Sequence, residues 1–436
     1  MLKNHPLSFA MLMAGLSLGT AWAIRGQFGH EYGAAWAGAI GSLSVLLVAK
    51  RSSWYAKVFS ATLAGAVGWG LGGLSSYGIV VGYGRDTEFI NVFYGLFMLF
   101  VIGGLYGFLG GGLFGLVLTD SKDKPVKWNE VIVEMVVGAV VFYFFMIEEF
   151  DWRMTPPRSE TWAVCFGAAV ALTWYLARHR HSSALRVAIF TGLGGGFGFA
   201  FGNFLQVLGH LSQISFNFWN VMEYSLGFFG GLGMAYGTLT SEWESTETTQ
   251  PKSQVWFPLL MVVLAIPFIV WQQSFDLERL QGIYSKINIA PQSPIHGYVQ
   301  LVSIGMVLAM TGWCWFYFYQ TRATLVSYSQ NDIVALFLGL WGLYIVFSLL
   351  ITGAFMSNYR IEQYLYIANW ILVALLIGKT QPIYTPLPLI PKKWAINFGG
   401  LLVFFAVLTF LLIHSHGELK GAQKRFGAPP TVENAQ

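Results

Sequence analysis

Long apolar segments, each about the length of a membrane-spanning helix, follow one another along almost the whole of this 436-residue chain. A helix needs about 20 mostly apolar residues to cross the hydrocarbon core of a bilayer. Charged residues make up only 11% of the sequence, against about 25% in soluble domains, so they are too few to cover a surface that faces water. We therefore predict an all-α polytopic membrane protein whose first partner is the lipid bilayer.

Thirteen apolar segments are long enough to be considered, and we expect each to form a transmembrane helix. The run 363–378 is the weakest of them, which keeps counts of 12 and 14 helices as alternatives. The predicted spans are 7–24, 32–49, 57–83, 89–118, 131–147, 161–177, 184–209, 216–240, 255–272, 298–320, 332–354, 363–378 and 394–414.

Lys and Arg are distributed unevenly between the two sides of the membrane that this arrangement defines. Loops on the side of the N-terminus hold 15 of them and the opposite side holds seven, with the C-terminal tail set apart. Cytoplasmic loops of membrane proteins carry the excess of Lys and Arg. We therefore expect an integral protein of a bacterial inner membrane with its N-terminus in the cytoplasm. The side of the C-terminus stays open together with the helix count.

Glycine divides the chain into two parts. Of the 50 glycines, 37 lie in residues 1–240 and 13 in the remainder. We expect a glycine-rich core of eight transmembrane helices over 1–240, a hydrophilic cytoplasmic linker over 241–254 and a five-helix module over 255–414. Residues 415–436 are polar and contain two prolines, a composition typical of a disordered tail.

The glycine-rich part resembles itself at a distance. The stretch 66–73 (AVGWGLGG) is similar to 194–202 (GGGFGFAFG), and 103–107 (GGLYG) is similar to 230–233 (GGLG). A parallel duplication of four helices each explains both similarities.

Glycines in this part also recur every four residues, as at Gly103, Gly107, Gly111 and Gly115. Such a stripe of small residues lets helix backbones approach closely in lipid. We therefore expect a tightly packed bundle, although the same glycines would also permit the sliding that a transporter needs.

Two carboxylates lie inside predicted spans, where an ionisable group marks a functional site by default. Glu223 shares a helix face with Gly227 and Gly231, so we expect it to face protein and not lipid. Glu134 lies four residues before Gly138 and also faces a helix contact. We predict that Glu223 and Glu134 couple transport to an ion. Interhelical hydrogen bonds that orient the helices are the alternative.

Amide side chains and a histidine gather at the predicted outer end of the same bundle. Gln206 and His210 share a helix face with Gly202, Asn203 is adjacent to it, and Asn220 begins the next predicted helix. We expect these side chains to contribute to a substrate site.

The first outer loop is the most distinctive local feature of the sequence. Arg25, Gln27, His30 and Glu31 lie within seven residues, among glycines that let the backbone turn sharply and a ligand approach. We predict that all four bind substrate. A tight charged turn that ends two helices at the lipid headgroups is the alternative.

Arg153 and Arg158 belong to a second outer segment rich in carboxylates and aromatic rings. Arginine pairs with carboxylates through two parallel hydrogen bonds, so we include both residues in the predicted site for a polar, hydroxylated or carboxylated ligand. Anchoring at the headgroup level by the aromatic belt explains the segment equally well.

Several classes of function lack support in the sequence. Lys and Arg form no stripe that would bind nucleic acid, and the two cysteines have no spacing typical of a metal site or a disulfide framework. There is no nucleotide-binding loop and no protease or hydrolase motif. We expect no metal, no cofactor and no catalytic residue. The polar residues of the second half, Asn358, Arg360, Glu362 and Asn369, are interpreted as part of a supporting scaffold.

The length, the number of spans and the repeat resemble secondary transporters in general architecture, although loop 50–57 lacks the signature of the major facilitator class. We expect an ion-coupled transporter of a small polar solute such as a sugar, a sugar acid or another organic anion. The site would lie between the first, third, seventh and eighth spans. The alternatives are a membrane-embedded transferase for a lipid-linked or periplasmic substrate, with His30 as general base, and a structural subunit of a complex with partner membrane proteins or with further copies of itself.

Overall fold

The computed structural model describes residues 6–245, 247–354, 360–381, 384–388 and 390–427. In this part of the chain the fold is all-α apart from one short antiparallel pair of strands, β1 (Gln250–Pro251) and β2 (Leu325–Val326). Among the described residues, nine helices are long and apolar enough to cross a membrane. The expectation of an all-α membrane protein is confirmed, while the number of crossings stays a prediction.

The glycine-rich half contains ten helices in the described residues, and a π-helical turn, η2, continues α7. Their bounds are α1 (Pro6–Arg25), α2 (Glu31–Ala49), α3 (Ser52–Tyr55), α4 (Val58–Gly72), α5 (Gly78–Tyr83), α6 (Phe89–Thr119), α7 (Trp128–Tyr143), η2 (Phe144–Glu149), α8 (Trp162–Arg178), α9 (Ser182–Leu211) and α10 (Phe218–Leu239).

The second half adds the helices on which α1 and α2 also pack. Their bounds are η3 (Lys252–Gln254), α11 (Trp256–Leu260), η4 (Met261–Ala265), α12 (Ile266–Ser274), α13 (Leu277–Tyr284), η5 (Ser285–Ile287), α14 (Ile295–Cys314), η6 (Trp315–Gln320), α15 (Gln330–Thr352), α16 (Glu362–Leu376), η7 (Ile377–Lys379) and α17 (Pro391–Ser415).

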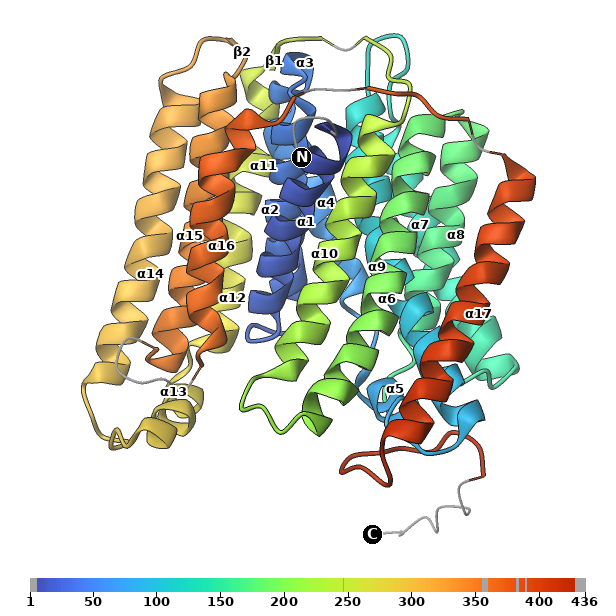
Figure 1. Ribbon diagram of the computed structural model, residues 1–436. Coiled ribbons are helices and arrows are strands. Elements are labelled where there is room, and N and C mark those ends of the chain that lie inside the picture. Colours follow the sequence, from blue (N-terminus) through green and yellow to red (C-terminus); the bar gives the residue numbers. More distant parts are fainter. Residues whose placement is uncertain (1–5, 246, 355–359, 382–383, 389, 428–436) are drawn as a thin grey trace.

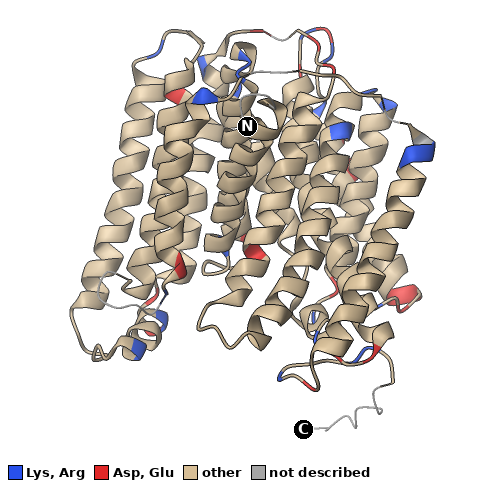
Figure 2. Cartoon of the chain, in the orientation of Figure 1, with Lys and Arg blue, Asp and Glu red and all other residues tan. Residues whose placement is uncertain are grey.

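The helices run roughly parallel to one axis, with α1, α2 and α4 in the middle of the molecule (Figure 1). The helices α11 to α16 lie on one side of this centre, and α7, α8 and α17 lie on the other (Figure 1). Charged residues gather at the two ends of the bundle and are sparse between them (Figure 2). This distribution fits a bundle whose middle section faces hydrocarbon.

One predicted span is divided in the structure. The run 57–83 forms α4 and the short α5, with a break between them. At the break the chain passes directly against the α1–α2 turn, because a Cβ atom on Gly73 would lie 2.9 Å from the Cα atom of Glu31. The division places Tyr77, the residue before α5, inside the bundle.

Glycines bring the central helices into backbone contact. A Cβ atom on Gly195 of α9 would lie 2.5 Å from the carbonyl oxygen of Gly103 on α6, and one on Gly231 of α10 would lie 2.5 Å from that of Ala14 on α1. No side chain larger than hydrogen fits at these crossings without a shift. In a parallel duplication, α8 and α9 would correspond to α2 and α4. The helices α2 and α4 pack along each other, whereas α8 and α9 share only a small contact, so the duplication stays a prediction.

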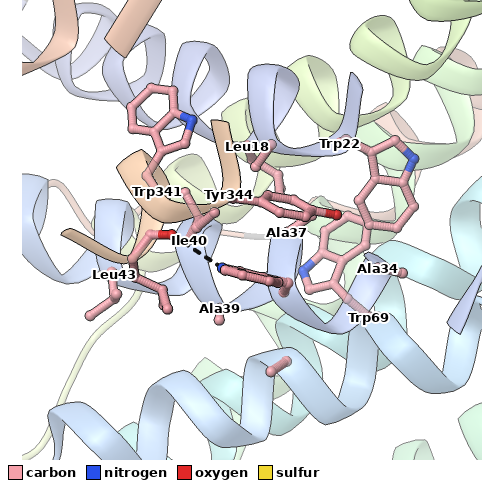
Figure 3. Close-up of a cluster of buried hydrophobic side chains, with 14 of the residues drawn as sticks. Leu18, Trp22, Ala34, Ala37, Ala39, Ile40, Leu43, Trp69, Trp341 and Tyr344 are labelled. Carbon is pink, nitrogen blue, oxygen red and sulfur yellow. Dashed lines mark hydrogen bonds between the residues drawn. The ribbon is translucent and has the colours of Figure 1, made fainter. Parts of the chain in front are cut away.

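Large aromatic side chains fill the centre where α2 presents small residues. Trp22, Trp69 and Tyr344 lie around Ala34 and Ala37 (Figure 3). The rings of Trp22 and Trp69 are 4.8 Å apart and both are fully buried. This packing joins α1, α2, α4 and α15 into one apolar core.

The C-terminal tail folds back against the end of the bundle opposite the N-terminus (Figure 1). The Gln423 amide donates to the carbonyl oxygen of Gly82 at 3.0 Å, and the Phe426 amide donates to Asn91 Oδ1 at 2.8 Å. Disorder is expected from the composition of 415–436, yet these contacts hold the tail as far as Gly427, because buried polar groups at the ends of α5 and α6 accept its backbone amides. Residues 428–436 lie outside the described residues.

Candidate functional site

A buried ion pair joins the end of α1 to α10. Arg25, the last residue of α1, is 1% exposed, and its Nη1 atom lies 3.1 Å and 3.2 Å from the two carboxylate oxygens of Glu223. The Glu223 side chain is 6% exposed. Because α1 and α10 pack along each other through their small residues, the two charges meet across a helix contact.

Tyr77 and His30 complete the surroundings of this ion pair. The Tyr77 hydroxyl donates to Glu223 Oε1 at 2.6 Å and accepts from Arg25 Nη1 at 3.0 Å. Arg25 Nη2 lies 3.1 Å from His30 Nδ1. Since a guanidinium can only donate, Nδ1 of His30 is the acceptor in this contact.

Local sequence explains why a charged side chain fits at this depth. A Cβ atom on Gly33 would lie 3.2 Å from Arg25 Cγ, so the glycine leaves room for the arginine stem. The Arg25 guanidinium carbon also lies 5.2 Å from the centroid of the Trp22 ring, a cation–π contact that stabilises a desolvated cation. Glycine and tryptophan around the predicted loop therefore place its cation inside the protein.

A cavity of about 400 Å³ opens beside the ion pair, at the end of the bundle that holds the α1–α2 turn. This volume lies within the range of sites that bind small molecules. The residues that line it are Ala23, Gly26, Gln27, His30, Tyr77, Asn217, Trp219, Asn220, Glu223, Arg279, Ile283, Lys286, Ile351, Thr352 and Arg360. The cavity thus lies between α1, α10 and α13 and the ends of α15 and α16.

The second half of the chain contributes a chain of hydrogen-bonded side chains to this cavity. Ser348 Oγ on α15 donates to Gln27 Oε1 at 2.9 Å. Gln363 Nε2 on α16 donates to Ser348 Oγ at 2.8 Å, and Thr352 Oγ1 donates to Gln363 Oε1 at 2.9 Å. The turn after α1 is therefore fixed by helices that lie more than 300 residues later.

The two asparagines at the start of α10 connect it to α1 and α16. Asn220 Nδ2 donates to the Ala23 carbonyl at 2.9 Å and to the Tyr366 hydroxyl at 2.5 Å. Asn217 Nδ2 donates to Glu362 Oε1 at 2.8 Å. Glu362 also accepts from Arg360 at 3.3 Å, and Arg360 lines the cavity. Of the other residues interpreted as scaffold, Asn369 contacts Thr20 and Tyr224 outside the lining, and Asn358 lies outside the described residues.

The structure brings five of the predicted site residues together: Arg25, Gln27, His30, Asn220 and Glu223. It places Asn203 and Gln206 elsewhere, as a buried pair 3.2 Å apart on α9 that faces α5. His210 is exposed at the end of α9 and contacts the Gln206 carbonyl at 2.7 Å. The predicted contribution of the seventh span to the cavity is therefore not seen among its described lining residues.

The remaining predicted residues lie outside the cavity lining. Glu31 begins α2 and is half-buried, and Arg153 pairs with Asp151 at 2.5 Å in an exposed loop that also holds Arg158. Glu134, in the first half of α7, pairs with Arg178 toward the end of the bundle opposite the cavity. These positions are set by tertiary packing that residue spacing alone does not reveal.

Sequence reasoning did not select Tyr77, Lys286, Thr352 or Gln363. A signal existed for Tyr77, since it ends the triplet Ser75, Ser76, Tyr77 that interrupts an apolar run. The others lie in the second half, Lys286 in the long loop 273–297 and Thr352 and Gln363 at the ends of apolar spans, and no spacing links them to the first outer loop.

Behind the ion pair the protein is closed by aromatic side chains. The Trp22 ring lies 5.5 Å from the Tyr106 ring and 4.8 Å from the Trp69 ring, and all three are fully buried. Trp22 also lies against Arg25, whose guanidinium carbon is 5.2 Å from the ring centroid. The chain matches no family model, no curated protein and no solved structure.

A second polar hollow of about 310 Å³ lies at the opposite end of the bundle. His181, at the start of α9, lines it and contacts Thr119 Oγ1 at 3.0 Å. Burial, together with the charges of Lys124 and His179, lowers the pKa of His181 to about 4, so this imidazole is neutral at physiological pH. Among the described residues, no three His, Cys, Asp or Glu side chains converge as a metal site would need.

Proposed function

We propose that this protein is a secondary, ion-coupled transporter of a small polar solute such as a sugar, a sugar acid or another organic anion. The observation that carries the proposal is the polar cavity beside a buried ion pair in a bundle of apolar helices. Ionisable groups at such depth are costly and mark substrate or ion pathways. The cavity reaches one end of the bundle. We infer that the buried rings of Trp22, Trp69 and Tyr106 close it toward the other end, as one state of an alternating-access cycle requires.

Within this proposal the N-terminus lies in the cytoplasm of a bacterial inner membrane, on the side richer in Lys and Arg. The cavity then faces outward. Gln27, Asn220 and Arg25 are proposed to bind the solute, and Glu223 is proposed as the coupling group because it is the only carboxylate among the described residues that line the cavity.

The geometry supports transport better than the transferase alternative. A general base needs a free acceptor near the substrate and a group that orients it. His30 Nδ1 instead accepts from the Arg25 guanidinium, and the neighbouring Glu31 is outside the cavity lining. The contacts at His30 are therefore those of a residue that positions Arg25.

Uptake into proteoliposomes tests the proposal. The purified chain would be reconstituted, and accumulation of labelled solutes that stabilise the protein in a thermal-shift screen would be measured under an imposed proton or sodium gradient. We expect gradient-driven accumulation that is lost in Glu223→Gln. Glu134→Gln is the matched control, since Glu134 pairs with Arg178 at the other end of the bundle.

Absence of gradient-driven uptake of every stabilising solute would contradict the transport proposal. Loss of coupling in Glu134→Gln with retention in Glu223→Gln would assign the coupling role to the other carboxylate.

A further inference from the structure

The charged residues that line the cavity beside the ion pair are mainly cations. Arg279 of α13, Lys286 of η5 and Arg360 before α16 all line it, against the single carboxylate of Glu223. Arg360 also pairs with Glu362. A concave site lined by one sign of charge attracts ligands of the opposite sign and raises their local concentration. The electrostatics of this cavity are those of an anion site.

Arg25 lies directly behind this lining, in contact with three of its members. It bonds Glu223, Tyr77 and His30, and its Nε atom has no hydrogen-bond partner among the described residues. A guanidinium binds a carboxylate through two parallel hydrogen bonds. Glu223 contacts this guanidinium through Nη1 alone, at 3.2 Å and 3.1 Å, so the pair shows that a carboxylate fits against Arg25 at this position.

The high free-energy cost of an unpaired buried charge limits how Arg25 and Glu223 can separate. A buried guanidinium without a partner is strongly unfavourable, so Glu223 leaves Arg25 only when another anion replaces it. Glu223 then loses the guanidinium that compensates its charge, and a proton taken up by the carboxylate restores neutrality. Exchange of the partner of Arg25 and protonation of Glu223 are thus two parts of one step.

We propose that the cavity binds a small organic anion whose carboxylate replaces Glu223 on Arg25, while Glu223 takes up one proton from the outer solution. This inference rests on the proposed transport function and specifies its substrate class and coupling ion. No bond other than the O–H bond of the Glu223 carboxyl is formed. One anion and one proton enter together, so a monovalent anion binds without a net change of charge.

Protonation of Glu223 takes place among groups from every neighbouring element. These charged and titratable neighbours are Arg25, Tyr77 and Tyr106, together with His30, Arg279, Lys286 and Arg360 of the cavity lining. Glu362 pairs with Arg360. The cations among them oppose the uptake of a proton when Glu223 stays on Arg25, and the arriving anion removes that opposition. Binding is therefore expected to tighten as the pH falls.

Calorimetric titration of the detergent-purified full chain tests the inference without any translocation. The probes are gluconate, lactate and succinate, each compared with its uncharged counterpart: glucose, propanediol and butanediol. Titration in two buffers of different ionisation enthalpy reports the protons taken up on binding. We expect saturable binding of at least one anion and not of its counterpart, with uptake of about one proton per anion.

Variants assign the roles of the residues. Glu223→Gln should bind the anion without proton uptake and with an affinity independent of pH. Lys424→Gln, which breaks an exposed ion pair with Glu88 outside the cavity lining, should keep both the proton uptake and the pH dependence. Arg25→Gln should lower the affinity by about 10- to 100-fold, as expected for the loss of a charge-assisted hydrogen bond. The double variant Arg25→Gln, Glu223→Gln carries no unpaired charge and repeats this measurement on a protein that retains its packing.

Equal binding of an anion and its uncharged counterpart would overturn the inference, as would proton uptake that persists in Glu223→Gln or a lack of binding by every anion tested. Anion binding with the expected proton uptake, together with an absence of flux in proteoliposomes, would refute the transport proposal and leave the anion site standing.

Discussion

At the scale of single residues, the buried Arg25–Glu223 pair needs hydrogen bonds and space from its neighbours. Two ions removed from water are stabilised only when their geometry is good and additional hydrogen bonds satisfy their remaining donors and acceptors. Tyr77 and His30 supply such bonds, and Gly33 supplies the space for the arginine. The pair is therefore better explained as a site than as a source of stability.

Removal of one partner of this pair should destabilise the fold far more than removal of both. Arg25→Ala leaves the Glu223 charge buried and unpaired, so we expect a loss of about 3–5 kcal/mol. Arg25→Ala combined with Glu223→Gln should recover much of that loss. Thermal unfolding in detergent, followed by the loss of helical circular dichroism, measures both.

Lys424→Gln is the control for this series, because it breaks an exposed ion pair with Glu88 and should leave the unfolding temperature unchanged. Equal destabilisation by the single and the double variant would show that the two charges do not depend on each other.

At the scale of secondary-structure elements, glycines decide which helices form the centre. Glycine stripes on α6, α9 and α10 bring helix backbones into direct contact. Lipid supplies no hydrophobic driving force for this contact, and van der Waals packing stabilises it. The glycines of α14 differ, since a Cβ atom on Gly305 or Gly312 would meet nothing within 4 Å. Glycine therefore marks a contact on some helices and only open space on others.

Gly195→Ala should destabilise the bundle, because the new methyl group would lie 2.5 Å from the Gly103 carbonyl oxygen. Overpacking of this kind costs about 1–3 kcal/mol. Gly305→Ala, with free space around the methyl group, should leave stability unchanged or raise it slightly. Unfolding temperatures of the two variants, measured side by side, make the comparison.

An equal effect at Gly195 and Gly305 would mean that helix propensity, and not the α6–α9 contact, controls the outcome.

At the scale of the whole molecule, the C-terminal tail packs against the end of the bundle opposite the N-terminus (Figure 1). Asn91 holds the tail through both polar atoms of its side chain: Nδ2 donates to the Phe426 carbonyl at 3.1 Å, and Oδ1 accepts the backbone amides of Arg425 and Phe426 at 2.9 Å and 2.8 Å. Nδ2 also donates to Asp86 at 2.7 Å. One buried amide side chain thus connects the last described residues to the start of α6.

Trypsin should cleave the tail slowly in the native protein and rapidly in Asn91→Ala, because the variant frees the backbone around Lys424 and Arg425. Glu88→Gln is the matched control, since it removes only the exposed ion pair to Lys424. The size of the products on a gel reports cleavage. In right-side-out vesicles the same digestion tests the proposed orientation, in which the tail lies outside.

Protection of the tail in Asn91→Ala would show that other contacts hold it. Cleavage only in inverted vesicles would reverse the orientation.

The sequence by itself determined the class of this protein and the approximate extent of its helices. Hydrophobicity over about 20 residues is a local property, and it alone decides whether a segment is stable in hydrocarbon. The predicted runs therefore overlap the observed α-helices from α1 to α17, apart from the short α3 and α13. Arg25 and Glu223 were also recognisable separately, because charge near or inside an apolar span is conspicuous.

Only the tertiary structure decided that these residues meet. Arg25 and Glu223 are 198 positions apart, Gln27 and Ser348 are 321 apart, and no periodicity connects them. Asn203 and Gln206 are equally conspicuous in the sequence, but they pair with each other and face α5 instead of the cavity. Which helix faces meet depends on the packing of the whole bundle, where each contact competes with all others, and a local pattern does not contain that information.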